Sequence, residues 1–212
     1  MTVDVIKEIY TAVLEGNVED ASTGVQKALD SKIGVSEILD QALISAMDLV
    51  GEKFGEGEIF IPQVLWSAKA MQAGMDLLKP LLASSDRAES GKVVIGTAKG
   101  DIHDIGKNLV AIMLEGAGFE VIDLGVDVSP ERFVEKAKEE QAHVIAMSAL
   151  LTTTMQSMGE VVTLLKKQNL PHVKVLIGGA PVDQAFCDEI GAHAYGMDAV
   201  DGVRKVKGLL GR

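Results

Sequence analysis

The sequence predicts a mixed α/β protein that begins with a helical bundle and continues with a doubly wound parallel sheet. Up to residue 83, apolar residues recur every three or four positions, as they do on the buried face of a helix. From residue 92 onward, short aliphatic runs alternate with helical stretches, which is typical of a sheet covered on both faces. The polar stretch 84–91 separates the two patterns and has the composition of a linker. We therefore expect a helical cap domain over 1–83, a linker over 84–91 and an α/β domain over 92–212.

The first part contains four helical segments with short connections, and this predicts an antiparallel four-helix bundle. Asn17 and the stretch 31–34 separate the first helices, and Pro62 suits the first turn of the last one. The third helix has an apolar stripe made of Leu39, Leu43, Ala46, Met47 and Val50. The stripe of the last helix consists of Val64, Ala68, Met71, Met75, Leu78 and Leu82.

The second part contains five strand candidates, the last of them weaker than the others: 93–97, 120–124, 143–148, 173–177 and 192–195. Helical stretches follow them over 104–116, 130–140, 153–169, 182–190 and 198–209. Strands that alternate with helices predict a five-stranded, doubly wound (Rossmann-type) sheet, for which we expect the flavodoxin-like strand order.

The composition excludes several classes of protein. A net charge of −11 argues against nucleic acid or an anionic membrane as a partner. The single cysteine, Cys187, excludes an internal disulfide and a Cys-rich metal site, and packing is its expected role. No apolar run reaches the roughly 18 residues of a membrane span, and no signal peptide is visible, so we expect a soluble, cytoplasmic protein.

The decapeptide 100–109, Gly-Asp-Ile-His-Asp-Ile-Gly-Lys-Asn-Leu, is the most informative segment for function. It follows the first strand, so His103 is expected on a loop at the carboxyl end of a strand, where open sheets bind ligands. A histidine there can ligate a metal while a carboxylate such as Asp101 holds its other nitrogen. A lone histidine is more often a loop residue with a local hydrogen bond, and His143, His172 and His193 are expected to be structural or solvated.

Two nucleotide-binding motifs do not match this segment. Five residues separate Gly100 from Gly106, where a P-loop has four, and Asn108 stands where Ser or Thr would bind magnesium. A Gly-x-Gly-x-x-Gly motif is also absent after the first strand, which argues against a dinucleotide site.

A three-part pattern, Asp101-x-His103-x-x-Gly106, then Ser148-x-Leu150, then Gly178-Gly179, resembles the cobalamin-binding signature of corrinoid proteins. These include the corrinoid domain of cobalamin-dependent methionine synthase and the small corrinoid proteins of methylamine- and methanol-type methyltransferase systems. The resemblance extends over essentially the whole chain, because the first 80 or so residues are similar to the helical cap of that family.

The resemblance implies a cobalamin or related corrinoid bound base-off, with its displaced nucleotide tail in the α/β domain. His103 would be the lower axial ligand of cobalt and Asp101 the carboxylate that orients it. Ser148 would hydrogen-bond this ligand network, with Thr152 lining the same pocket. The other cofactor-binding residues implied are Ile102, Asp104, Gly106, Leu150, Gly178, Gly179, Tyr195 and Gly196. Strand ends, helix caps, turns and core packing remain the alternative roles for Ser148, Thr152, the glycine pair and Tyr195.

The cap carries a second match, because residues 54–68 resemble the segment that covers the upper face of the corrin in methionine synthase. Phe54, Ile61 and Val64 stand at the face-covering positions. An apolar lid would shield a reactive cobalt–methyl bond from water, whereas helix-core packing is the alternative for any one of these residues.

The function implied is that of a methyl carrier between a substrate:corrinoid methyltransferase and a second methyltransferase, with tetrahydrofolate or coenzyme M as acceptor. Such a protein is a carrier subunit and not a complete enzyme, it can also meet a reductive activase, and linker 84–91 would be its hinge. No residue selects among methylamines, methanol, glycine betaine and methoxyaromatics as donors. The alternatives are a cobalamin-responsive sensor and a flavodoxin-like module for another cofactor.

Overall fold

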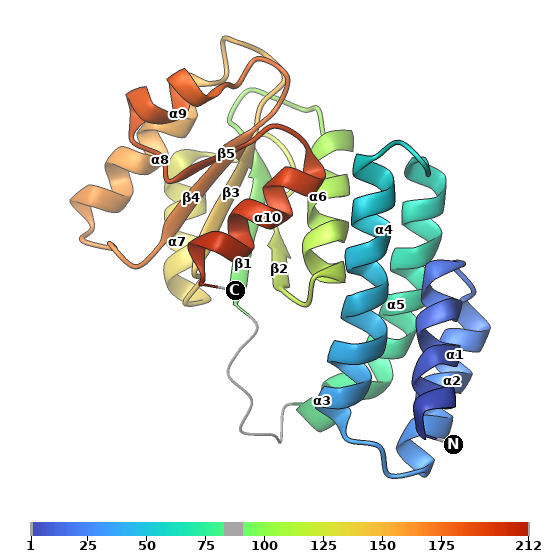
Figure 1. Cartoon of the computed structure of the whole chain (residues 1–212). Helices are drawn as coiled ribbons and strands as arrows, with labels where there is room; N and C mark the ends of the chain where they lie inside the picture. The colour runs from blue at the N-terminus through green and yellow to red at the C-terminus, as the bar shows by residue number, and fades with distance from the viewer. Residues whose placement is uncertain (1, 83–90, 212) are drawn as a thin grey trace. The chain divides into compact units, whose positions relative to one another are not determined.

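A computed structural model describes residues 2–82 and 91–211, which form a helical unit and an α/β unit (Figure 1). The short segment Glu115–Gly118 groups with the helical unit. Most of the expected linker 84–91 lies outside the described residues, so the domain boundaries and the hinge stay predictions. Among the helices of the described ranges, none has the length and apolar character needed to cross a membrane.

The helical unit is the predicted four-helix bundle. Its elements are α1 (Thr2–Leu14), α2 (Val18–Asp30), α3 (Val35–Ile38), the π-helical segment η1 (Leu39–Ile44), α4 (Ser45–Gly55) and α5 (Ile61–Leu82). Because α3, η1 and α4 follow one another without a break, they count as one of the four helices. Asn17 caps α2 by accepting the N–H of Asp20 at 3.2 Å, after a turn at Gly16 with a φ of 72°.

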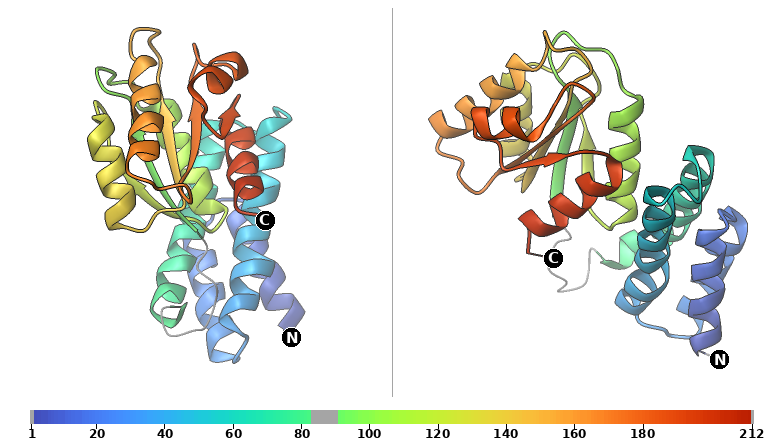
Figure 2. Two further views of the ribbon diagram at one scale, coloured as in Figure 1. Left: turned by 90° about the vertical axis from the view of Figure 1, so that its left-hand side faces the viewer. Right: turned by 45° about the horizontal axis from the view of Figure 1, so that its top comes forward.

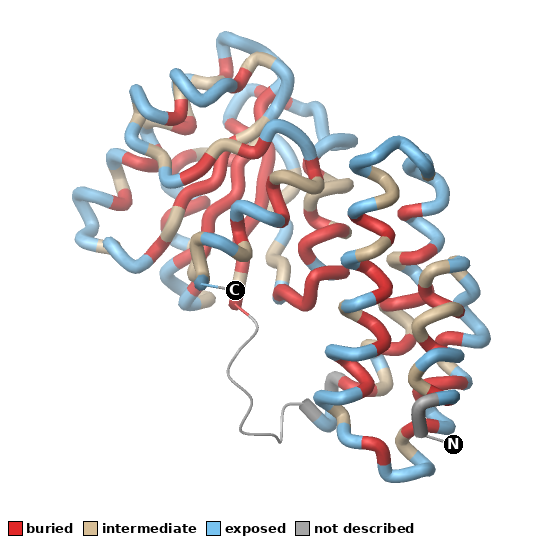
Figure 3. The backbone as a smooth tube through the Cα atoms, in the orientation of Figure 1, coloured by how far each residue is buried: buried red, intermediate tan, exposed pale blue. Residues whose placement is uncertain are grey.

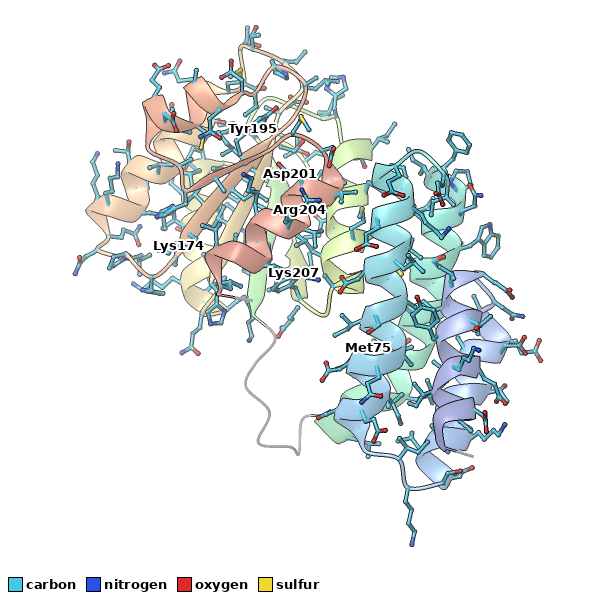
Figure 4. All side chains as sticks on the ribbon, in the orientation of Figure 1. Met75, Lys174, Tyr195, Asp201, Arg204 and Lys207 are labelled. Atoms are coloured by element: carbon cyan, nitrogen blue, oxygen red, sulfur yellow. The ribbon has the colours of Figure 1, made fainter. Side chains whose placement is uncertain are left out.

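The apolar stripes expected in the bundle face its core. Every residue of the third helix's stripe is buried, although the helix contains one π-helical turn. At that turn the Ser45 hydroxyl donates to the carbonyl oxygen of Asp40 at 2.6 Å. This bond gives the carbonyl a donor where the regular α-helical pattern of hydrogen bonds is interrupted. In α5, Val64, Met71 and Leu78 are buried, whereas Ala68 and Met75 (Figure 4) are half-buried.

The α/β unit contains one sheet of five parallel strands in the order β2-β1-β3-β4-β5, which is the flavodoxin-like order expected. The strands are β1 (Lys92–Thr97), β2 (Glu120–Asp123), β3 (Val144–Ser148), β4 (Lys174–Gly178) and β5 (Ala194–Gly196). Thr97 pairs with Ser148, which pairs with Gly178, which in turn pairs with Gly196. The last residues of four strands therefore line up along one edge of the sheet.

Helices cover both faces of this sheet: α6 (Ile105–Gly116), α7 (Pro130–Glu139), α8 (Gln156–Lys167), α9 (Gln184–Ile190) and α10 (Ala199–Leu209). Helices α6 and α10 lie on one face, and α7 and α8 lie on the other (Figure 2). Val94, Ile145 and Ile177 join Phe133 of α7 and Val161 of α8 in a buried apolar cluster. The strands accordingly form the buried middle layer (Figure 3).

Several element boundaries differ from the predicted ones by one to three residues, and two of them have clear local reasons. The helix expected over 153–169 begins at Gln156, because residues 151–155 form turns that include a Thr154 N–H to Leu151 O bond of 3.1 Å. The strand expected over 192–195 spans Ala194–Gly196. Ala192 takes part in the turn that ends α9, since its N–H donates to the Cys187 carbonyl at 3.0 Å just after Gly191, whose φ is 71°.

Candidate functional site

The loop between β1 and α6, together with the first turn of α6, carries the Asp101-x-His103-x-x-Gly106 motif at the carboxyl edge of the sheet. It turns sharply because Gly100 has a φ of 83° and the Asp101 N–H donates to the Ala98 carbonyl at 3.0 Å. Strand β1 lies between β2 and β3, where the chain reverses the direction in which it builds the sheet. At such a switch point, loops diverge and leave space for a ligand.

The carboxylate of Asp101 is 0 % exposed and is hydrogen-bonded through both oxygens. Oδ1 accepts the His103 N–H at 3.0 Å and lies 2.7 Å from His103 Nδ1. Oδ2 accepts the N–H groups of Leu150 at 2.7 Å and Leu151 at 3.2 Å, and lies 3.0 Å from the Thr154 hydroxyl. Asp101 thus joins the loop after β1 to the loop after β3.

Two opposing effects act on the ionisation of Asp101. Burial by itself would raise the pKa of this carboxyl, because it disfavours the charged form. The hydrogen bonds from the His103 and Leu150 N–H groups, and from the His103 and Thr154 side chains, outweigh burial and hold the pKa well below its ordinary value. Asp101 is therefore a carboxylate at neutral pH and acts as a hydrogen-bond acceptor.

The ring of His103 is fixed on one side and open on the other. Its side chain is 48 % exposed although Nδ1 is held by Asp101. A neutral ring that donates Nδ1–H to a carboxylate keeps the lone pair of Nε2 for a ligand. The hydroxyl of the buried Thr97 also donates to the carbonyl oxygen of His103 at 3.0 Å. The structure therefore presents one nitrogen of a well-positioned imidazole.

The loop after β2 holds the motif from another side, through Asp127. Its Oδ1 accepts the Gly100 N–H at 2.7 Å, and its own N–H donates to the Asp101 carbonyl at 2.9 Å. We call these two bonds the Asp127 clasp. Asp127 has a φ of 53°, in the left-handed region that Asp tolerates better than most other residues with a side chain.

The remaining motif residues have different surroundings. Ile102 is exposed. Asp104 accepts the Asn108 N–H at 2.7 Å through its carbonyl and the Asn108 side-chain amide at 3.0 Å through Oδ2, so it stabilises the start of α6. A Cβ added to Gly106 would meet nothing within 4 Å. Gly106 thus borders open space, as a site that must admit a ligand requires.

A cavity of about 270 Å³ lies beside the motif, on the α6 and α10 face of the sheet. Six of the residues implied by the sequence pattern line it: Gly106, Ser148, Gly178, Gly179, Tyr195 and Gly196. Aliphatic residues complete much of the wall, among them Ile95, Leu109, Val110, Ala146 and Leu176. Residues from four parts of the chain therefore converge on one largely apolar cavity.

Glycines at the strand ends let backbones approach closely beside this cavity. A Cβ on Gly178 would lie 3.0 Å from the Gly196 carbonyl oxygen, and one on Gly196 would lie 3.0 Å from the Cα of Gly202. Gly179 has a φ of 122°, and a Cβ there would lie 1.9 Å from the Ala149 oxygen. This part of the cavity is therefore bounded by main chain and excludes larger residues.

The hydroxyl that contacts Asp101 is that of Thr154, and the hydrogen bond expected from Ser148 to the ligand network stays a prediction. Ser148 ends β3, lines the cavity and accepts the Ala98 N–H at 2.9 Å through its carbonyl. Thr152 does not line this cavity: it is exposed and borders a separate hollow formed by residues of α8 and α9. The turns over 151–155 bury Thr154 and leave Thr152 outside. Leu150 contributes its N–H, while its side chain is exposed.

Sequence reasoning missed four residues of the site: Thr97, Lys107, Asp127 and Thr154. Lys107 lines the cavity, is 3 % exposed and pairs with Asp123 at the end of β2. The sequence alone does not show that a lysine is buried, because it does not show which acidic residue pairs with it. Thr154 lies in a run of three threonines, and only the turn decides which of them is buried.

Some expected residues have other surroundings. The ring of Tyr195 (Figure 4) packs against the apolar cluster on the α7 and α8 face, although the residue also lines the cavity. In the helical unit, Phe54 is half-buried, Ile61 is exposed and Val64 is buried. The burial of Val64 fits core packing, and the face-covering role of the three residues stays a prediction.

The other histidines and the cysteine fit structural or solvated roles. His143 Nδ1 accepts the Lys92 N–H at 3.0 Å, and His193 Nδ1 accepts the Val175 N–H at 3.1 Å. Partial desolvation of its ring lowers the pKa of His193, although the residue is exposed, and the positive charges of Lys174 and Lys166 lower it further. His172 is exposed and Cys187 is buried.

Two family models, each described as a B12 binding domain, match the chain over residues 91–204 and 5–79. A corrinoid protein of Desulfitobacterium hafniense (strain Y51) is 40 % identical to it over 216 residues, covering 100 % of both chains. Dimethylamine corrinoid protein 1 of Methanosarcina acetivorans is 44 % identical over 98 % of each chain.

A solved structure is similar over nearly the whole chain. In the methanol:cobalamin methyltransferase complex MtaBC of Methanosarcina barkeri, one chain matches with a TM-score of 0.88 and 32 % identity. The match covers 99 % of the present chain and 81 % of that one.

Proposed function

Since the chain belongs to the corrinoid proteins, the B12-binding proteins of methylamine and methanol methyltransferase systems, we propose that it carries a methyl group between two methyltransferases on a bound corrinoid. A substrate-specific methyltransferase would deliver the methyl group. An acceptor methyltransferase would pass it to tetrahydrofolate or coenzyme M. The chain itself is then a carrier subunit.

The observation that carries this proposal is the contact of 2.7 Å between His103 Nδ1 and the buried Asp101 carboxylate. With Nδ1 engaged, Nε2 is the nitrogen that would ligate cobalt if the corrinoid binds with its own base displaced, so that His103 would serve as the lower ligand. The carboxylate fixes the tautomer and raises the basicity of the ring. Because Thr97 and the Asp127 clasp already hold this loop, little ordering is needed when the ligand binds.

The cavity supports the same cofactor. A base displaced from cobalt would need a place away from water, and the apolar space bordered by Gly106, Gly178 and Gly196 offers one at the last residue of the motif. Bound there, the corrinoid supplies a cobalt centre that can take up and release a methyl group. The chain's own residues bind the cofactor, orient it and keep water from its tail.

The first experiment reconstitutes the protein with hydroxocobalamin and compares the absorption spectra of the wild type and His103→Ala. We expect the wild type to retain the corrinoid after gel filtration, and its cobalt bands to shift in His103→Ala because the axial nitrogen is lost. His172→Ala is the matched control, since His172 is exposed and lies outside the motif. Its spectrum should equal that of the wild type.

Two results would count against the proposal. Identical spectra for the wild type and His103→Ala would remove His103 as the ligand. A wild-type protein that retains no corrinoid would remove the carrier function. With the cofactor in place, methanol- and methylamine-specific methyltransferases can then be tested as donors.

A further inference from the structure

A second hollow of the α/β unit, with a volume of about 740 Å³, lies between α8 and α9, which are side by side (Figure 1). It shares none of its lining residues with the cavity beside the motif. We call it the α8–α9 groove. One face of α8 and the last turn of α9 form it, and the residues used below to describe this groove are Met155, Gly159, Thr163, Lys167, Phe186 and Ile190.

The groove extends along the whole of α8. Met155, Gly159, Thr163 and Lys167 line it at intervals of four residues, so they lie on one face of the helix. Helix α8 has 12 residues, and at 1.5 Å per residue this face is about 18 Å long. Gly159 in its middle has no side chain, and a Cβ there would lie 3.3 Å from Ile190 Cγ2. The groove is therefore elongated, and its length suits a docked helix of about three turns.

The floor of the groove is apolar. Met155, Leu164, Phe186 and Ile190 are partly buried and pack against the apolar cluster on the α7 and α8 face. Each of them also lines the groove, so part of its apolar surface stays in contact with water. Covering such surface with the apolar face of another helix is favourable.

The rim of the groove carries mostly negative charge. Glu131, Glu160 and Glu189 line it and are exposed, whereas Lys167 is the one cation among its described lining residues. Within the described ranges, the carboxylates of Glu160 and Glu189 take part in no hydrogen bond or ion pair. The net charge of −11 also attracts cationic partners over a longer range. Lysine or arginine therefore complements this rim.

One end of the groove lies at the loop that follows β3. Thr152 and Met155 line this end and belong to the turns over 151–155. In the same turns, the Leu151 N–H and the Thr154 hydroxyl contact the Asp101 carboxylate. A helix bound along α8 would thus end near the carboxyl edge of the sheet, where the motif lies, and would leave the cavity uncovered.

We propose that the α8–α9 groove is a docking site for a partner protein, and that its occupant is an amphipathic helix with lysine or arginine beside its apolar face. The apolar face of this helix covers the floor, and its cations meet the carboxylates of the rim. The inference goes beyond the proposed function, because docking in the groove does not require a corrinoid in the cavity.

The test uses the full chain and three synthetic helical peptides of equal length. The first has leucines along one face with lysines on both sides of them. The second has glutamates in place of the lysines, and the third has serines in place of the leucines. Fluorescence anisotropy measures the dissociation constants. We expect the first peptide to bind with a Kd below about 1 mM, and at least about tenfold more tightly than either of the others.

A pair of matched variants assigns the binding to the groove. Glu160→Lys replaces an attractive charge on the rim by a repulsive one, so the first peptide should bind roughly three- to tenfold more weakly. Glu135→Lys makes the same change at an exposed residue of α7 that does not line the groove, and its Kd should equal that of the wild type. Both variants should retain hydroxocobalamin as the wild type does, since neither residue lines the cavity.

Four results would overturn the proposal. The first peptide does not bind; the two variants weaken its binding equally, which assigns it to net charge; or the third peptide binds as tightly as the first, which leaves the apolar floor without a role. The fourth is a dimer of the protein alone, seen by sedimentation velocity and lost in Glu160→Lys, because a second copy of the chain would then fill the groove. Intact peptide binding by a protein that retains no corrinoid would instead count against the proposed function alone.

Discussion

Asp101 connects the imidazole of His103 to the loop after β3, where it contacts two backbone N–H groups and one side-chain hydroxyl, that of Thr154. The Thr154 hydroxyl lies 3.0 Å from Asp101 Oδ2 and 2.8 Å from the Leu151 carbonyl oxygen, and the residue is buried. A buried carboxylate is sensitive to the loss of any one donor, because water cannot replace it. The orientation of His103 therefore depends on a residue outside the sequence motif.

Replacing Thr154 by valine tests this dependence. Thr154→Val keeps the side-chain shape but removes a hydrogen bond to a buried charge, so we expect the free energy of unfolding to fall by about 1–3 kcal/mol. Urea denaturation monitored by circular dichroism measures this. The neighbouring Thr153 is exposed, and Thr153→Val should change the free energy of unfolding by less than about 0.5 kcal/mol. Equal effects of the two substitutions would show that the Thr154 hydroxyl contributes nothing specific.

At the scale of elements, hydrogen bonds join the loop after β1, at Gly100 and Asp101, to the loops that follow β2 and β3. The Asp127 clasp fixes Gly100 and Asp101 from the β2 side, and the Asp101 carboxylate reaches the N–H groups that follow β3. The His103 loop is thus held from both neighbouring strands. Such a loop opens less often than one anchored only at its ends.

The Asp127 clasp predicts a local change in hydrogen exchange. Asp127→Ala removes the acceptor of the Gly100 N–H, so the exchange of that amide should become roughly tenfold faster or more. Exchange followed by NMR measures it residue by residue. Asp127→Asn is the matched control, because it keeps a side-chain oxygen and tolerates the left-handed backbone. An unchanged Gly100 exchange rate in Asp127→Ala would contradict the clasp.

Sequence patterns predicted the elements well because each pattern reflects burial. The aliphatic runs became the strands of the sheet, and the strand order is the flavodoxin-like one that was expected. The motif also located His103 and Asp101, which the structure brings together. The partners of Asp101 could not be predicted in the same way. Whether Ser148, Thr152 or Thr154 contacts Asp101 depends on the turns over 151–155. These turns are held by contacts with Asp101, which lies about 50 residues earlier in the sequence, and a local sequence pattern does not show such contacts.

At the scale of the whole molecule, the stability of the chain should depend on pH through His193. Its folded-state pKa is lowered, first by partial desolvation of the ring of this otherwise exposed residue and then by nearby lysines, and its Nδ1 accepts the Val175 N–H. The unfolded chain therefore binds the proton more readily than the folded chain. The stabilisation is present above the ordinary histidine pKa of about 6.5 and is lost as pH falls below it.

The expected result is a urea midpoint that decreases between about pH 7.5 and 5.5, by less in His193→Gln than in the wild type. Glutamine keeps an acceptor for the Val175 N–H without a titrating group. His172→Gln is the control, since His172 is exposed and should leave the pH dependence unchanged. A His193→Gln profile parallel to that of the wild type would rule out His193 as the source.

Main-chain atoms form one end of the cavity, and this limits how far the size of the cavity can vary. Side chains change rotamers within picoseconds to nanoseconds, but the carbonyls and Cα atoms around Gly178, Gly196 and Gly202 have no rotamers to change. The outline of this end of the cavity is therefore as constant as the sheet itself. Only a displacement of α10 as a rigid body, which is a slower motion, can make it wider or narrower.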